Sequence, residues 1–229
     1  MLTFIFDIDG TLVDSNELHV DSWDRAFRRF GKEFPREKLR AQIGKGSDQY
    51  LPEFLTPEEI HRFGKELDDY RSDLFKKEYL PKVRPFPKVR ELFQRIRDDD
   101  KRIVLATSGK KDDTKYYIDL LKIENLIEGC TSGDDAESSK PAPDIFAASL
   151  KKLGDISPAD AVTVGDTRFD IEAARKAGVK TIAFLCGGTS GAVLREAGAI
   201  AIYSDPADFL AHYDELIKGF MSESIRRRI

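Results

Sequence analysis

The sequence has little of several residue types and patterns that define whole classes of proteins. Its 229 residues include two cysteines, Cys130 and Cys186, which exclude a disulfide framework and suggest a reducing compartment. The net charge is -4, so the chain lacks the basic surplus of a broad nucleic-acid surface. It also lacks a membrane-length apolar run, and a basic segment followed by a long apolar one at its start. We therefore expect a cytoplasmic protein that binds neither nucleic acid nor membranes.

The rest of the composition is that of an ordinary globular protein. Hydrophobic residues make up 41% of the chain and charged residues 34%. A chain of this length can bury a sizeable core, as one large domain or as one domain with an insertion.

Apolar runs of strand length alternate with stretches of helical periodicity through most of the chain. These runs are continuous, which is typical of strands that are covered on both faces. The predicted strands are 2–6, 102–107, 161–165, 180–185 and 199–203, and the predicted helices are 89–98, 114–121, 143–153, 170–177 and 190–196. This alternation predicts an α/β fold with a Rossmann-like parallel sheet and right-handed crossovers.

Residues 16–85 break the alternation, because they contain no clear strand and show helical patterns instead, at 17–30, 49–54 and 57–79. Prolines stiffen the return segment at 81–87. We therefore predict a small α-helical domain, residues 16–85, inserted into a core domain made of residues 1–15 and 86–220. The basic segment 221–229 is predicted to be a flexible tail.

Polar side chains follow the predicted strands at the point where each strand ends. In an open parallel sheet, ligands bind beyond the carboxyl ends of the strands, so these side chains should converge. They are Asp7 and Asp9 after the first strand, Thr107 and Ser108 after the second, Asp166 and Asp170 after the third, and Lys140 just upstream of the third.

This set of side chains suits phosphoryl chemistry. A spacing of two directs Asp7 and Asp9 to one side of an extended segment, with Ile8 turned toward the core. One carboxylate can attack phosphorus while the other transfers protons. Asp7 and Asp166 would form a hard oxygen site suited to Mg²⁺, and Lys140 could hold phosphoryl oxygens together with a hydroxyl.

Each of these residues also has an ordinary structural interpretation. The aspartate pair after the first strand could form a turn, and Lys140 could be a solvated loop lysine. Asp166 or Asp170 could cap the following helix, and Thr107 could satisfy a backbone group at the strand end. The combination, in this order, favours catalysis.

Four segments, DIDGT, ATSG, KPAPD and GDTRFD, follow one another along the chain, each near a predicted strand end. They resemble the four motifs of the haloacid dehalogenase-like (HAD) superfamily, most of whose members are phosphohydrolases. The resemblance covers residues 1–203 and is strongest to the phosphoglycolate phosphatase and β-phosphoglucomutase branch. It implies that the inserted helical domain is the small four-helix cap of that family.

The resemblance also implies a role for each motif residue and a Mg²⁺-dependent phosphatase that acts on a small phosphorylated metabolite. Asp7 would be the nucleophile and a metal ligand, and Asp9 the general acid/base and a metal ligand through its backbone carbonyl. Thr107, Ser108 and Lys140 would contact the phosphate. Asp166 would be a direct Mg²⁺ ligand and Asp170 a supporting carboxylate.

The cap offers two further candidate residues. His19 shares a helical face with Trp23, so it could face the substrate or serve as a hinge histidine. Lys45 lies between glycines in a segment similar to the cap loop of this branch, which suits an anionic substrate. The alternative for this segment is a plain turn that ends a helix.

Other functions stay open at this level. A sugar phosphomutase is the main alternative, although its cap loop carries an arginine near the place where this chain has Asp48. A dehalogenase has no need for the metal, and a non-catalytic protein that binds phosphorylated metabolites would not need the full set of motif residues. The substrate is not fixed by the sequence, and we expect a monomer.

Overall fold

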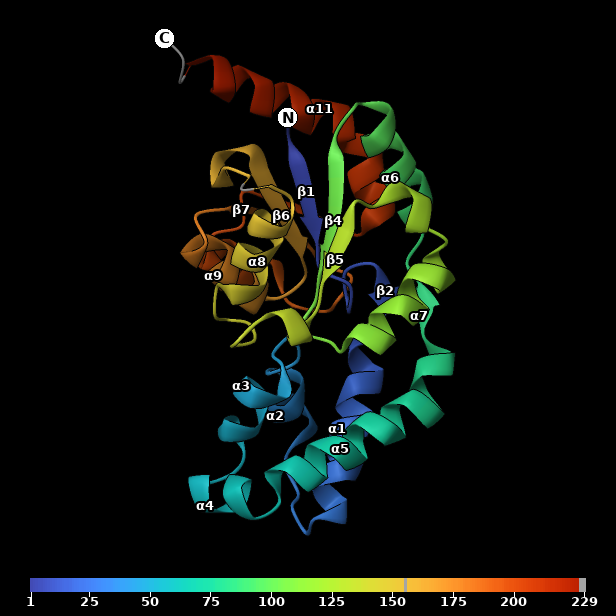
Figure 1. Ribbon diagram of the computed structural model, residues 1–229, viewed down its shortest axis with the longest axis vertical. Coiled ribbons are helices and arrows are strands. Elements are labelled where there is room, and N and C mark those ends of the chain that lie inside the picture. The colour runs from blue at the N-terminus through green and yellow to red at the C-terminus, as the bar shows by residue number, and fades with distance from the viewer. Residues whose placement is uncertain (155, 227–229) are drawn as a thin grey trace.

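A six-stranded parallel sheet forms the centre of the larger domain (Figure 1). The structure is a computed structural model that describes residues 1–154 and 156–226. In spatial order the strands are β5 (Gly129–Thr131), β4 (Arg102–Ala106), β1 (Thr3–Phe6), β6 (Ala161–Gly165), β7 (Lys180–Phe184) and β8 (Ala201–Tyr203). All four residues of β1 are buried, because β4 and β6 flank this strand and helices cover its two faces.

Helices pack on both faces of the sheet. On one face, Phe6 contacts Phe93 with ring centroids 4.8 Å apart, and on the other, Ile5 packs with Phe146 and Ala173. The first face is covered by α6 (Val89–Asp98), α7 (Lys111–Leu121) and α11 (Pro206–Arg226), and the second by α8 (Asp144–Lys152), α9 (Arg168–Lys176) and α10 (Gly191–Ala197). Successive side chains of β1 therefore point to opposite faces of the sheet and pack in two separate apolar layers.

The cap lies beyond the carboxyl ends of the strands, at the bottom of Figure 1. Its helices are α1 (Asn16–Arg29), α2 (Arg36–Arg40), α3 (Ser47–Tyr50), α4 (Pro57–Glu59) and α5 (Lys65–Leu74), with π-helical turns at Ile60–Gly64 and Phe75–Tyr79. Trp23 and Phe27 of α1 pack against Tyr50, with the Trp23 and Tyr50 rings 4.5 Å apart. The cap thus has an apolar cluster of its own.

Two short strands lie where the chain passes between the two domains. β2 (Val13–Asp14) and β3 (Arg84–Pro85) pair in antiparallel fashion, with Val13 opposite Pro85. Sequence patterns did not reveal this pair, because two residues are too few to show a period.

The structure confirms the predicted α/β class and the inserted helical cap. The exact boundaries of the domains stay a prediction. β5 was missed, since its three residues include Gly129 and the half-buried Cys130 rather than an apolar run. α2 and α11 were missed as well. The backbone of α11 continues to Arg226, within the segment predicted to be a flexible tail, and residues 227–229 lie outside the described part.

Within residues 1–154 and 156–226, no helix combines the length and the apolar character that crossing a membrane requires.

Candidate active site

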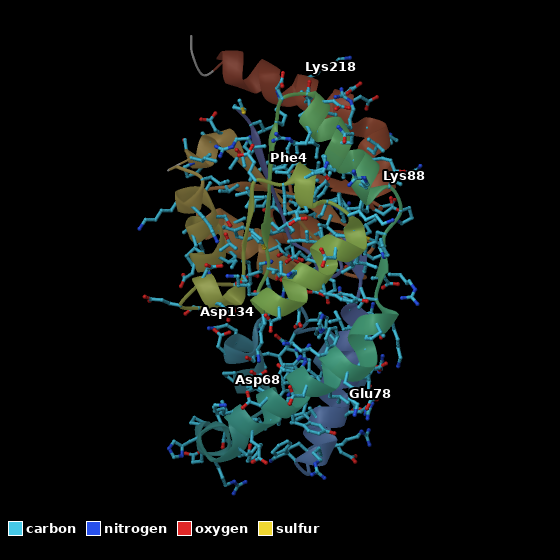
Figure 2. All side chains as sticks on the ribbon, turned by 45° about the vertical axis from the view of Figure 1, so that its right-hand side comes forward. Phe4, Asp68, Glu78, Lys88, Asp134 and Lys218 are labelled. Carbon is cyan, nitrogen blue, oxygen red and sulfur yellow. The ribbon has the colours of Figure 1, made fainter. Side chains whose placement is uncertain are left out.

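The carboxyl ends of β4, β1 and β6 lie next to one another and face the cap (Figure 1). Figure 2 shows side chains from both domains in the space between the labelled Asp134 of the core and Asp68 of the cap. A cavity of about 110 Å³ lies there. The predicted residues that line it are Asp7, Asp9, His19, Lys45, Thr107 and Ser108.

Asp7 lies at the floor of this cavity, directly after β1. One carboxylate oxygen, Oδ1, is 2.5 Å from Lys140 Nζ, and the other accepts a hydrogen bond from Thr11 Oγ1 at 3.3 Å. Burial raises the pKa of the Asp7 carboxyl to about 7, although Lys140 acts in the opposite direction. The predicted orientation is confirmed for the neighbouring Ile8, which packs in the core.

Lys140 is enclosed by the core, with a relative exposure of 1%. Its Nζ lies 2.5 Å from Asp7 and 2.7 Å from Asp170, and donates to the Ala106 carbonyl at 3.3 Å. Burial alone would lower the pKa of the ammonium group, but the charges of Asp170 and Asp7 raise it above its usual value. Lys140 is therefore a fixed cation at the site, and the solvated-loop interpretation is wrong.

Asp166 lies beside Asp7 at the end of β6 and is fully buried. Its Oδ1 accepts from Thr11 Oγ1 at 3.0 Å, and its Oδ2 accepts from Asn16 Nδ2 at 2.9 Å. Burial, followed by the charges of Asp170 and Asp7, raises the pKa of this carboxyl well above its usual range. The negative charge at Asp166 is thus poorly compensated by the chain itself.

Asp170 has a different environment from the other two carboxylates of the site. Its Oδ2 accepts from the backbone amide and the hydroxyl of Thr167, at 3.0 and 2.6 Å, in a capping box at the start of α9. Its Oδ1 faces Lys140. Asp170 therefore caps a helix and also supports Lys140, so the two interpretations of this residue are compatible.

The chemistry of this acidic cluster fits a magnesium ion. Asp7, Asp166 and Asp170 each offer an oxygen, and these oxygens lie within 4.8 Å of one another. They are hard donors, which Mg²⁺ prefers, and the raised pKa values of Asp7 and Asp166 indicate that the cluster needs more positive charge than Lys140 supplies. Because Asp170 is already engaged by Thr167 and Lys140, Asp7 and Asp166 are the better candidates for direct ligands.

Glycine keeps the space around Asp166 open. Gly10 has a φ of +74°, and a Cβ atom there would lie 2.4 Å from Asp166 Oδ2. Any side chain at this position would both strain the backbone and displace the carboxylate.

Asp9 lies on the same side of the chain as Asp7 but has a contrasting environment. Its Oδ1 accepts three hydrogen bonds, from Ser15 Oγ at 2.6 Å, His19 Nε2 at 2.9 Å and Tyr117 Oη at 3.0 Å. Burial raises the pKa of this carboxyl, but the interactions with His19, Ser15 and Tyr117 more than offset it and lower the pKa to about 2.

The two hydroxyls after β4 differ in their contacts. Thr107 Oγ1 accepts from the Gly109 amide at 3.0 Å, which matches the structural interpretation of this residue. Ser108 Oγ is buried and has no partner within the described residues, although Ser108 lines the cavity. An unpaired buried hydroxyl costs free energy unless a ligand or water satisfies it, so Ser108 is a good candidate to bind a phosphoryl oxygen.

His19 connects Asp9 to the cap. Its ring stacks on Phe75 at 4.1 Å, and Arg71 Nη2 lies 2.5 Å from its Nδ1. A guanidinium has only donors, so this contact requires Nδ1 to accept and leaves the proton on Nε2, which donates to Asp9. The structure thus defines the tautomer of His19. Its ring connects Asp9 with Arg71 of the cap and lines the cavity.

Lys45 lines the cavity, but its ammonium group contacts other parts of the protein. Nζ lies 2.7 Å from Glu53 and 4.8 Å from the centre of the Phe169 ring. Asp48, in the first turn of α3 directly after this loop, accepts from the Ser139 amide at 3.0 Å, next to Lys140. This loop therefore rests on the core near the acidic cluster, and Asp48 is one of its contacts there.

Among the residues that sequence patterns missed at the site are Asn16, Arg71 and Tyr117. Asn16 and Tyr117 lie on the buried faces of their helices, where nothing distinguishes them from packing residues. Arg71 lies in a highly charged segment, KELDDYRSDL, in which no spacing marks one cation over another. Only their contacts with Asp166, His19 and Asp9 reveal them.

Comparison with known proteins agrees with this geometry. Residues 4–184 match the haloacid dehalogenase-like hydrolase family, so the chain belongs to that family. It is similar to a phosphorylated carbohydrates phosphatase of Thermotoga maritima, at 27% identity over 88% of this chain and 94% of the relative. It is also similar to a phosphoglycolate phosphatase of Aquifex aeolicus, at 27% identity over 82% of this chain and 86% of the relative.

The fold recurs among solved structures. A hydrolase from Pseudomonas syringae superposes with a TM-score of 0.84 at 29% identity, covering 94% of this chain and 99% of the other. The family match and the phosphatase names of the two relatives support the predicted enzyme class, a phosphatase.

Proposed function

We propose that this protein is a Mg²⁺-dependent phosphomonoesterase that acts through an aspartyl-phosphate at Asp7. The observation that carries the proposal is the pair of aspartates facing one cavity with opposite surroundings. Asp7 is held by Lys140 at the cavity floor, and Asp9 keeps one oxygen free of hydrogen bonds within the described residues. Two carboxylates in contrasting environments suit a nucleophile and a proton carrier.

In the first step, the buried Asp7 carboxylate attacks the phosphorus of the substrate and the bond to the leaving oxygen breaks. Lys140 and the Ser108 hydroxyl are placed to hold phosphoryl oxygens as negative charge develops on them. Burial strips water from Asp7, which makes its carboxylate a stronger nucleophile.

Asp9 supplies the proton that the leaving alcohol needs. A phosphate dianion that enters the cavity repels the Asp9 charge and so raises the pKa of this carboxyl, and Oδ2 takes up a proton from solvent as the substrate binds; this proton goes back to solvent when phosphate leaves. After the alcohol has left, Asp9 accepts a proton from a water molecule that attacks the same phosphorus. The Asp7–phosphate bond then breaks, inorganic phosphate is released and both carboxylates return to their starting state.

Asp7, Asp166 and the backbone carbonyl of Asp9 would hold the magnesium ion. When bound, it neutralises phosphoryl charge and makes phosphorus more electrophilic.

The cavity restricts the substrate. Its volume of about 110 Å³ is well below that of a typical pocket for drug-sized ligands, about 300 to 1,000 Å³. Arg71 and Lys110 line it, and within the described residues neither lies within ion-pair distance of a carboxylate. We expect a compact phosphomonoester whose second polar or anionic group points toward the cap.

The sugar phosphomutase alternative requires a cation at the tip of the cap loop. Asp48 occupies that region and accepts a hydrogen bond from the Ser139 amide, which favours hydrolysis over transfer to a sugar.

The test is phosphate release from a panel of phosphomonoesters with Mg²⁺ or EDTA, using wild type, Asp7→Asn and Asp14→Asn. Asp14 is an exposed aspartate close in sequence and serves as the matched control. We expect metal-dependent release from a few compounds, lost in Asp7→Asn and retained in Asp14→Asn. Borohydride reduction during turnover should convert Asp7 to homoserine in the wild type.

Absence of release from every compound would overturn the phosphatase proposal. Interconversion of hexose phosphates after priming with a bisphosphate would then favour the mutase.

A further inference from the structure

The Asp9 carboxylate is bound asymmetrically. All three of its hydrogen bonds end on Oδ1, and none within the described residues ends on Oδ2. Oδ2 lies toward the loop after β4, because a Cβ atom at Gly109 would be 4.0 Å from it. One oxygen is therefore saturated with donors, and the other is available to the cavity.

The three donors come from different parts of the molecule. His19 belongs to α1 of the cap, and Ser15 lies at the crossing directly before α1. Tyr117 belongs to α7, which packs on the central sheet. The cavity lies between the two domains, so any movement of the cap relative to the core would displace His19 relative to the core. Tyr117 stays with the core.

Tyr117 is well suited to be a lasting donor. Its side chain is 2% exposed and its ring packs in the main apolar cluster, so its hydroxyl has one orientation. A tyrosine hydroxyl carries its proton at neutral pH, and Tyr117 donates this proton to Asp9 Oδ1 at 3.0 Å. Rotation of an aspartate about χ2 is otherwise loosely restricted.

We propose that Tyr117 is a positioning residue that orients the Asp9 carboxylate from the core side, so that Oδ2 is the oxygen that delivers the proton to the leaving group. This inference rests on the proposed phosphatase function. Without the Tyr117 hydroxyl, the carboxylate would be held only by Ser15 and His19 and would rotate when the cap moves.

The consequence depends on the substrate. An alkyl phosphate releases a basic alkoxide and needs the proton from Asp9, whereas p-nitrophenyl phosphate releases a stable phenolate and does not. A defect in proton delivery therefore affects kcat/KM for the first substrate much more than for the second. A general loss of folding or of phosphate binding affects both alike.

The experiment compares wild type, Tyr117→Phe and Tyr116→Phe with both substrates in saturating Mg²⁺, using the best alkyl phosphate from the substrate panel. Tyr116 is the neighbouring tyrosine on α7, its ring also packs against the main apolar cluster, and it is not among the described residues that line the cavity. General acid catalysis contributes about 10²- to 10⁴-fold, so partial misorientation should lower kcat/KM for the alkyl phosphate by about 10-fold in Tyr117→Phe. We expect less than about a 3-fold change with p-nitrophenyl phosphate, and no change in Tyr116→Phe with either substrate.

A double-mutant cycle gives a second readout. Asp9→Asn should lower kcat/KM for the alkyl phosphate more than Tyr117→Phe does, again with a smaller effect on p-nitrophenyl phosphate. Adding Tyr117→Phe to Asp9→Asn should not lower kcat/KM for the alkyl phosphate any further.

Three results would overturn the inference. The first is that Tyr117→Phe lowers kcat/KM equally for both substrates, and the second is that it lowers kcat/KM for neither. The third is that it lowers kcat/KM further when added to Asp9→Asn. In each case the wild type still releases phosphate, so the proposed function stands. A wild type that releases no phosphate from any substrate would overturn both.

Discussion

The core half and the cap half of the site hold their cations in different ways. Lys140 of the core touches Asp7, Asp170 and a backbone carbonyl, all within the core, and is almost completely buried. Within residues 1–154 and 156–226, the hydrogen bonds and ring contacts of Arg71 are with cap residues: its guanidinium lies 4.8 Å from the centre of the Trp23 ring and 5.1 Å from that of Phe75, and is bonded to His19 and Ser22.

This difference indicates that the two cations have different roles. The core cation is tied to Asp170 and to Asp7, the proposed nucleophile, so its position does not depend on the substrate. The guanidinium of Arg71 has further N–H donors, and within the described residues no carboxylate lies within ion-pair distance of it. It can therefore bind an anionic group of the substrate. We therefore expect the core residues to govern the reaction and the cap residues to govern the choice of substrate, and the following predictions test this difference.

The largest expected difference is between the two lysines of the site. Lys140→Met should lower kcat by about 10³-fold, because it removes a preorganised cation from the phosphoryl group. It should also lower the free energy of unfolding by about 3 to 5 kcal/mol, since Asp7 and Asp170 lose their buried partner. Lys45→Met should change kcat by less than about 3-fold, because Lys45 is engaged with Glu53 and Phe169.

Phosphate release and thermal unfolding measure both effects. Lys140→Arg retains a charge and controls for folding. Equal kinetic defects at positions 140 and 45 would contradict the division between core and cap.

Arg71 should affect some substrates more than others. Arg71→Gln should lower kcat/KM by about 10- to 100-fold for a phosphomonoester that also carries a carboxylate, because a hydrogen bond to a charged group is lost. The loss should be several-fold smaller for a neutral isostere, such as 2-hydroxyethyl phosphate beside 2-phosphoglycolate. Arg29→Gln, which changes an arginine elsewhere on the cap, is the control. The same loss with both compounds would make Arg71 a positioning residue for His19 alone.

The affinity for Mg²⁺ should depend on pH because carboxyl groups of the core, and not of the cap, lose protons when the ion binds. The pKa of Asp7 lies at about 7 in the absence of metal, against 3.8 in an unfolded chain, so the folded protein holds an extra proton between these values. Metal-free protein should therefore lose stability as pH rises from about 4 to 7. Mg²⁺ binds the deprotonated forms of Asp7 and Asp166, and both carboxyls have a raised pKa, so its affinity should rise with pH by up to about 10-fold per pH unit for each of the two that titrates.

The difference in melting temperature between Mg²⁺ and EDTA samples, measured from pH 5 to 8, reports this coupling. It should vanish in Asp166→Asn and persist in the control Asp134→Asn, whose side chain contacts the amide of Lys111 instead. A difference that is constant across pH would show that Asp7 does not take part in metal binding.

The smallest effect is expected at the contact between the cap loop and the core. Asp48→Ala removes the acceptor for the Ser139 amide, an exposed hydrogen bond, so kcat/KM should fall by only about 2- to 5-fold. Asp21→Ala serves as the control, because Asp21 pairs with Arg36 within the cap instead of contacting the core, and steady-state kinetics are the measurement. A loss as large as that of Lys140→Met would show that the cap loop shares in the chemistry.

Much of the core could be predicted because its signals are local. The apolar runs that became β1, β4, β6 and β7 are continuous and lie within one residue of the observed strands. The polar residues after them follow from parallel topology, since such strands bring their carboxyl ends to one edge. β5 could not be predicted, because Gly129 and Cys130 acquire strand geometry only by pairing with β4.

The cap was harder to predict in detail. Its helices other than α2 were expected, but the partners of Lys45 were not, because a lysine between glycines does not indicate whether it turns to Glu53 or to the substrate. Likewise, the role of Asp170 as both a helix cap and a partner of Lys140 depends on two loops meeting in space.

The sequence by itself determined the parallel α/β core, the insertion of a helical cap and the placement of Asp7, Asp9, Thr107, Lys140 and Asp166 at strand ends or close to them. These features depend on periodicity and short-range spacing, which the order of residues carries directly. Only the tertiary structure decided that Tyr117, Ser15 and His19 bind the same oxygen of Asp9, and that Arg71 faces the cavity without a carboxylate partner within the described residues. Such contacts join residues that are up to 108 positions apart, and they depend on how separate elements pack rather than on any local pattern.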